Sequence, residues 1–174
     1  MTDLPIRPLS NLEKVKHFHQ VFGHPVSDHI NVATDKLNRL RIRLIAEELG
    51  ELCDALGYSL SLITDGQGTH STDLTPSGAM PNPVEVADAL ADIEYVTLGA
   101  YLVFGLPGQR LFNEVHDSNM SKLGADGKPI YDDHGKVMKG PNTRKPDILK
   151  VLLAYNPDDT EREIPFADIS FAES

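Results

Sequence analysis

The stretch that decides the fold is LIAEELGEL at residues 44–52, in which apolar residues recur at helical spacing. It belongs to a longer apolar pattern that predicts a helix from about residue 35 to residue 56. With about 100° between successive residues, Glu48 falls in the middle of the apolar arc and Glu51 at its edge. A surface helix would place such a carboxylate on the opposite, polar side, so its position here is unusual.

A second stretch, VADALADIEYV at residues 86–96, repeats this anomaly within a helix predicted from about residue 83 to residue 104. Asp88, Asp92 and Glu85 share one stripe with residues suited to packing. Burying an unpaired carboxylate is costly, and neighbouring like charges raise one another's pKa. Two inward acidic stripes therefore call for a cation, and Mg²⁺ or Mn²⁺ suits carboxylate ligands best.

The alternative interpretation is that both stripes are solvated helix faces. That explanation is the more common one for a single Glu on a single helix. Two acidic stripes on helices expected to be neighbours favour the inward arrangement instead. The Glu-x-x-His pattern of di-iron helix bundles is absent from both stripes.

The rest of the chain is also mainly helical in pattern. Ser10 and Glu13 match a capping box that opens a helix ending at Gly23. Two further helices are predicted from Pro107 to Gly124 and over residues 147–154. The fold class expected is all-α, a bundle of four to five helices, in a domain over residues 1–156 followed by an acidic tail at 157–174.

Two connections interrupt the helices. Residues 57–82 predict a long loop between the second and third helices, rich in Gly, Ser, Thr and Pro. Within it, residues 58–64 fit either further helix or a short strand. Residues 129–138 predict a small C-terminal β-hairpin with its turn at residues 133–135.

Composition limits the function classes. The chain of 174 residues has 16 Lys and Arg against 26 Asp and Glu, a formal net charge of −10, which disfavours nucleic acid and anionic membranes as partners. The single cysteine, Cys53, excludes an internal disulfide framework. With no secretory leader and no long apolar run, a cytoplasmic location is expected. No P-loop or Rossmann glycine pattern occurs, and no nucleophile has an evident base partner.

Two basic features suit a phosphate-bearing ligand. Asn119 and Lys122 place an amide and an ammonium one turn apart, which fits phosphate oxygens, although a lysine at a helix C-terminus also interacts with the helix dipole. Lys139 belongs to a basic island in an otherwise acidic chain. That island is either a phosphate-facing flap or a solvated hairpin, and it also contains Lys136, Arg144 and Lys145.

Three segments together resemble the MazG-like all-α nucleotide pyrophosphohydrolases, which include phosphoribosyl-ATP pyrophosphohydrolase and the dimeric dUTPases. They are residues 44–52, residues 86–96 and VHDSNMSK at 115–122, in the order that the family has. The resemblance extends from about residue 18 to residue 146. It implies a MazG-like helical bundle completed by a homodimer or a homotetramer.

The family motif is EExxE followed downstream by ExxD. The resemblance implies Glu48, Glu51 and Asp92 as metal ligands. Ala89 stands where the family has Glu. Asp88, one turn from Asp92, is the preferred replacement, and Glu85 is the alternative.

The resemblance also implies a reaction, the hydrolysis of a (deoxy)nucleoside triphosphate to the monophosphate and pyrophosphate with two or three Mg²⁺ or Mn²⁺ per active site. Glu47, or one of the ligands, would orient the attacking water or take its proton, and Lys122 would stabilise the departing pyrophosphate. Asn119 and Lys139 would bind phosphate, and Phe18 and His19 would border the base. A purine (dGTP) and a pyrimidine (dUTP or dCTP) stay equally open.

Two other functions compete with this one. The absent glutamate at Ala89 fits a non-catalytic nucleotide-binding protein or a helical interaction module. A phosphoribosyl-nucleotide pyrophosphohydrolase is the second alternative, within the same superfamily.

Overall fold

The first helix, α1 (Asn11–Phe22), has the boundaries that its capping signals predict. The Ser10 hydroxyl accepts a hydrogen bond from the Glu13 N–H, and the Glu13 carboxylate accepts one from the Ser10 N–H, so the capping box is formed. Gly23 ends the helix with φ of 70°, a left-handed conformation that favours glycine. The protein is described here by a computed structural model, which covers residues 8–31 and 34–156.

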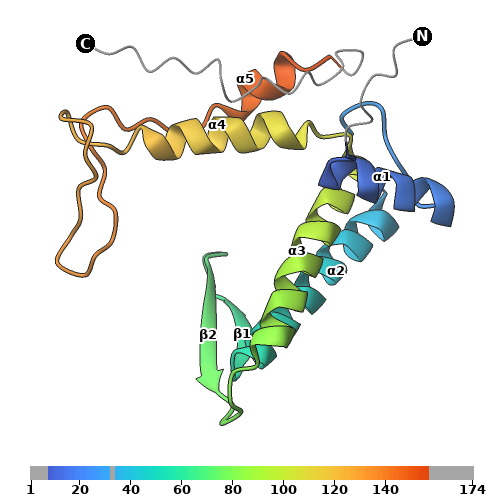
Figure 1. Ribbon diagram of the computed structural model, residues 1–174, viewed down its shortest axis with the longest axis horizontal. Coiled ribbons are helices and arrows are strands. Elements are labelled where there is room, and N and C mark those ends of the chain that lie inside the picture. The colour runs from blue at the N-terminus through green and yellow to red at the C-terminus, as the bar shows by residue number, and fades with distance from the viewer. Residues whose placement is uncertain (1–7, 32–33, 157–174) are drawn as a thin grey trace. The chain divides into compact units, whose positions relative to one another are not determined.

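Two long antiparallel helices, α2 (Asp35–Ala55) and α3 (Pro83–Phe104), pack along each other, and α1 packs on α3 (Figure 1). The core between them is small and consists mostly of short side chains. Its buried apolar residues on these helices are Val15, Cys53, Ala55, Ala89, Ala100, Leu102 and Val103.

The segment after α1 covers the carboxyl end of α3. The N–H groups of Ser27 and Asn31 donate to the carbonyls of Leu102 and Phe104 in the last turn, where a helix leaves carbonyls without helical partners. Gly105 has φ of 62°, and a Cβ there would lie 2.1 Å from the carbonyl oxygen of His29. Only glycine allows the backbone of this segment to approach the helix so closely.

The connection between α2 and α3 is not the structureless loop that the sequence predicts. Strands β1 (Tyr58–Thr64) and β2 (His70–Pro76) form an antiparallel hairpin in which Leu60 faces Leu74. The strand alternative for residues 58–64 is therefore confirmed. The polar and apolar residues of β1 alternate from Tyr58 to Leu62, whereas those of β2 do not, and so short a run does not by itself exclude a helix extension.

The last part of the chain contains α4 (Gly108–Met120) and a short helix α5 (Ile148–Leu153). The Glu114 carboxylate on α4 accepts hydrogen bonds from the Arg144 guanidinium and from the Asp147 N–H. The Ser118 hydroxyl donates to the Arg144 carbonyl, 3.0 Å away. These contacts hold residues 144–147 against α4.

The predicted C-terminal hairpin is wrong in extent. A single antiparallel bridge joins Tyr131 to Val137, and no strand forms around it in the described residues. The Asp132 carboxylate accepts from the N–H groups of His134 and Lys136, so the turn is satisfied locally by one side chain. The predicted turn at residues 133–135 is present, whereas the residues on either side of it form no further strand pairing.

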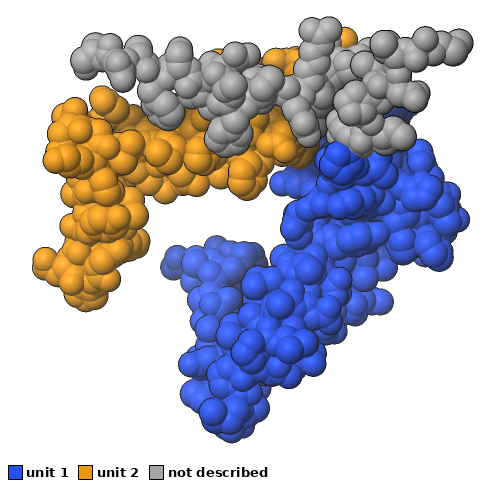
Figure 2. All heavy atoms as spheres, viewed as in Figure 1, with its two compact units in different colours: residues 1–106 blue, residues 107–174 orange. Residues whose placement is uncertain are grey.

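The chain divides into two compact units, residues 1–106 and 107–174, and each is considered by itself (Figure 2). The structure is mostly helical with one small antiparallel sheet, which confirms the expected fold class. In chain order that sheet comes between α2 and α3 rather than near the C-terminus. In the described ranges no single helix is long and apolar enough to cross a membrane. Only α3 and α4 taken together, as a bent pair, have the length and apolar composition for it. The acidic tail predicted at 157–174 lies outside the described residues.

Candidate functional site

The two acidic stripes lie along the neighbouring helices α2 and α3, and the inward arrangement expected from the sequence holds for Glu48 alone. Glu48 is half-buried, whereas Glu47, Glu51, Asp88 and Asp92 are exposed. We call these five residues the acidic cluster. Its position follows from the antiparallel packing, which sets the second half of α2 beside the first half of α3.

The electrostatics of Glu48 show how close these charges are. Partial burial raises the pKa of Glu48, and the charges of Glu51, Asp92, Glu47 and Asp88 raise it further. In the described part of the chain, no basic side chain forms an ion pair with any member of the acidic cluster. The cluster thus has an excess of negative charge that a cation would relieve.

The residue that departs from the family motif is now placed. Ala89 is 3% exposed and packs in the core of α2 and α3, so it offers no ligand. Asp88 is among the charges that act on Glu48, whereas Glu85 is not. Glu85 instead lines a pocket of about 390 Å³ together with Glu51 and Asp54, between the end of α2 and the start of α3.

The donor set fits a hard divalent cation, because all five side chains supply carboxylate oxygens. Within residues 8–31 and 34–156, no three Asp, Glu, His or Cys side chains are already arranged to hold an ion. Four of the five carboxylates are exposed and free to change rotamer. Binding would therefore require side-chain rearrangement on fixed helices.

An aromatic group lies on α1 and α3 beyond the acidic cluster. The ring of Phe18 lies 5.7 Å from that of Tyr95, edge to face, and 4.4 Å from that of Phe22. Phe18 also stacks on His24, with 5.7 Å between the ring centroids. Tyr95 is one turn along α3 from Asp92, so this aromatic surface adjoins the carboxylates.

His19, the other residue predicted at the base, is 3% exposed. Its Nδ1 lies 2.9 Å from the carbonyl oxygen of Pro25. Because that oxygen only accepts, Nδ1 carries the proton and Nε2 is left as an acceptor in the neutral ring. Burial lowers the pKa of His19, which favours this neutral form.

The sequence pattern did not single out Arg41. This residue is 5% exposed and lies on the inner face of α2. A Cβ at Gly99 would lie 3.0 Å from Nη1 of Arg41 and 3.0 Å from Nε2 of His19, so the two side chains meet over this glycine. Arg41 precedes Glu48 by seven residues and therefore shares its face of the helix. The periodicity that singled out Glu48 was the signal that could have found it.

The residues predicted to bind phosphate lie in the second unit. Lys122 Nζ donates to Asn119 Oδ1 at 2.7 Å, as their one-turn spacing predicts. The Gly140 N–H donates to the Lys122 carbonyl, so Lys139 adjoins the same segment in the chain. Of the basic island, Arg144 is engaged with Glu114 and serves to hold its own segment.

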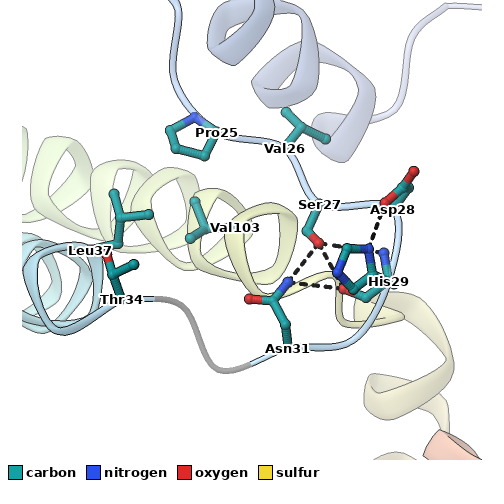
Figure 3. Close-up of a pocket in the computed structure, with 9 residues that line it drawn as sticks. All are labelled: Pro25, Val26, Ser27, Asp28, His29, Asn31, Thr34, Leu37 and Val103. Atoms are coloured by element: carbon teal, nitrogen blue, oxygen red, sulfur yellow. Dashed lines mark hydrogen bonds and ion pairs between the residues drawn. The ribbon is translucent and has the colours of Figure 1, made fainter.

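A second pocket, of about 350 Å³, lies where the segment after α1 crosses α2 and α3 (Figure 3). Leu37, Val103 and Pro25 provide apolar walls. Ser27 and Asn31 on the facing segment are bonded to each other and to the backbone of His29. These polar groups satisfy one another, so the pocket lacks the unneutralised charge of the acidic cluster.

Comparison with known proteins adds a family. The family model described as phosphoribosyl-ATP pyrophosphohydrolase matches residues 15–119. The uncharacterized protein L479 of Acanthamoeba polyphaga mimivirus is 28% identical over 148 residues, which are 83% of this chain and 48% of that protein. The chain thus spans about half the length of this curated relative. A crystal structure of a candidate NTP pyrophosphohydrolase from Exiguobacterium sp. 255-15 has 24% identity and a TM-score of 0.39, covering 84% of this chain and 96% of that one.

Proposed function

The chain belongs to the phosphoribosyl-ATP pyrophosphohydrolase family of the MazG-like superfamily, and we propose that it hydrolyses a (deoxy)nucleoside triphosphate to the monophosphate and pyrophosphate. The observation that supports this proposal is the acidic cluster. A half-buried Glu48 lies among four further carboxylates on two packed helices, and no basic residue of the described chain pairs with them. Such a site binds divalent cations, and through them phosphates.

We propose Glu48, Glu51, Asp88 and Asp92 as the residues that hold Mg²⁺ or Mn²⁺, two or three ions per site. The closeness of Asp88 to Glu48 favours it over Glu85 as the replacement for the missing glutamate. When bound, these ions would neutralise phosphate charge and make a nucleophilic water available at neutral pH.

The chain's own residues have distinct roles in this proposal. Glu47 is exposed beside Glu48 and is free to orient the attacking water and accept its proton. Phe18 offers a ring to the base. Asn119, Lys122 and Lys139 are proposed to contact phosphate oxygens, and the ammonium of Lys122 would stabilise charge on the departing pyrophosphate.

We also propose that the protein acts as a homodimer or homotetramer. Apolar side chains remain exposed along α2 and α3, among them Ile42 at 69%, Leu90 at 53% and Val84 at 74%. Exposed apolar residues spaced along two adjacent helices are typical of a surface that packs against another helix pair. A second copy of the chain supplies such a pair with matching spacing.

A substrate screen tests the proposed activity. The protein is incubated with each dNTP and NTP in Mg²⁺ or Mn²⁺, and monophosphate and pyrophosphate are measured together. We expect equal amounts of both products from at least one nucleotide. If no nucleotide is turned over, yet nucleotides bind and the binding is insensitive to Glu48→Ala, the protein is a nucleotide-binding module instead.

A phosphoribosyl nucleotide is the second candidate substrate, because the matching family model is named for phosphoribosyl-ATP. Competition between phosphoribosyl-ATP and the preferred dNTP in the same assay distinguishes the two. The compound with the larger kcat/KM is the substrate.

A further inference from the structure

Arg41 presents a charge that the rest of the protein does not balance. The residue is 5% exposed, and its Nε is buried without a hydrogen-bond partner. Burial lowers the pKa of Arg41, and within residues 8–31 and 34–156 no carboxylate forms an ion pair with it. A buried, unpaired cation is strongly destabilising, so it is kept where something else supplies the acceptor.

The surroundings of Arg41 are polar and unsatisfied as well. Asn38, one turn earlier on α2, has its Oδ1 buried without a partner. Nε2 of His19 is an unprotonated acceptor that meets Nη1 of Arg41 over Gly99. The group combines a cationic donor with two acceptors. It is complementary to a ligand edge that carries an oxygen beside an N–H group.

This group lies at a defined distance from the acidic cluster. Arg41 precedes Glu48 by seven residues on α2, and Gly99 follows Asp92 by seven residues on the antiparallel α3. Seven residues of α-helix span about 10 Å. This matches the separation between the phosphates and the far edge of the base in an extended nucleotide. Tyr95 and Phe18, whose rings are in edge contact, lie between the two levels and offer an aromatic surface.

Resting on the nucleotide pyrophosphohydrolase activity proposed above, we infer that Arg41 binds a carbonyl oxygen of the substrate's nucleobase, with Asn38 and His19 accepting from the neighbouring N–H. The substrate class is a nucleotide whose base carries a carbonyl beside an N–H group, namely uracil, thymine or guanine, whereas cytosine has only the unprotonated N3 beside its carbonyl. Adenine is the one common base without a carbonyl and is discriminated against. A site built to bond a polar group rejects an analogue that lacks it, because its own buried groups are left unpaired.

The test measures binding rather than turnover. The full chain is titrated calorimetrically, in Mg²⁺, with α,β-imido analogues of dUTP, dCTP, dGTP and dATP, which resist cleavage between the α- and β-phosphates. We expect at least one carbonyl-bearing analogue to bind more than tenfold tighter than the adenine analogue. Arg41→Met should weaken that analogue by roughly 10- to 100-fold and leave the adenine analogue unchanged.

Two further variants keep the outcome decisive. Arg43→Met removes an exposed charge from the same helix and should change no affinity, and Arg41→Lys should restore part of the preference. Equal binding of all four analogues to the wild-type chain would overturn the inference, as would equal weakening of all four in Arg41→Met. So would a change of oligomeric mass in Arg41→Met with the base preference intact. A base preference without any hydrolysis would overturn the proposed activity only.

Discussion

The two ends of one face of α2 carry opposite charges, and neither is balanced within the described part of the chain. Around Glu48 the carboxylates repel one another. Most of them remain in water, which keeps the energetic cost of this repulsion moderate. At Arg41 the side chain lies against Gly99 and His19, and its buried Nε has no acceptor. The difference teaches that the two ends of this face have opposite electrostatic requirements, a cation at the carboxylates and an oxygen acceptor at the guanidinium.

Removing the half-buried carboxylate should have the largest effect. Glu48→Gln keeps the size of the side chain and removes one charge, so we expect kcat/KM to fall by a hundredfold or more, on the order of several kcal/mol of lost cation-mediated stabilisation. The melting temperature should not fall, because repulsion is relieved. Glu94→Gln is the control, since it removes a charge from α3 outside the acidic cluster and retains an acceptor for Asn11.

The choice of fourth ligand gives the next largest effect. Asp88→Asn should raise the Mg²⁺ concentration for half-maximal activity by roughly 10- to 100-fold, in the range for disturbed metal sites. Glu85→Gln should change it much less, because Glu85 is absent from the charges that act on Glu48. The reverse order in a Mg²⁺ titration would reassign the ligand to Glu85.

At the basic end, Gly99→Ala tests the close packing. Its Cβ would meet Arg41 and His19 at 3.0 Å, so both must shift, and we expect the free energy of unfolding to fall by about 1–3 kcal/mol. Gly50→Ala is the matched control, since a Cβ on that α2 glycine meets nothing within 4 Å. That substitution should stabilise the helix by up to about 1 kcal/mol. Denaturant unfolding measures both.

The smallest effect concerns His19 and pH. Its pKa is lowered in the folded chain by burial, with smaller effects from Arg41 and His24. Below about pH 6.5 the unfolded chain takes up a proton that the folded chain resists, so the free energy of unfolding falls with falling pH. His19→Asn, which retains a donor for the Pro25 carbonyl, should flatten this dependence. The exposed His17→Asn should leave it unchanged, and equal slopes in all three proteins would contradict the assignment.

Helix-level features were predictable because their signals are local. The capping residues Ser10 and Gly23, and the position of Glu48 within an apolar arc, all follow from spacing along one helix. For residues 58–64 the pattern fits either a helix extension or a strand, and it predicts no partner strand at residues 70–76, with which they pair. Residues 129–138 pair at one bridge only, since pairing depends on neighbours that the sequence does not specify.

The candidate site shows the same limit. The acidic residues and the preference for Asp88 over Glu85 follow from spacing along each helix, whereas the effect of Asp88 on Glu48 depends on the packing of α2 on α3. Arg41 escaped notice because a basic residue on an apolar face looks like a long side chain reaching solvent. Only its contact with Gly99 and its missing partner show that it stays enclosed.

The attachment of residues 144–147 to α4 has a practical consequence for shortening the chain. Glu114 relies on Arg144 and on the Asp147 N–H for its partners, and the Ser118 hydroxyl bonds to the Arg144 carbonyl. A truncation placed before Arg144 would remove these bonds together with the segment that packs against Ser118 on α4. A minimal fragment that ends where the family match ends, at residue 119, should therefore express poorly, and the first safe endpoint lies beyond α5.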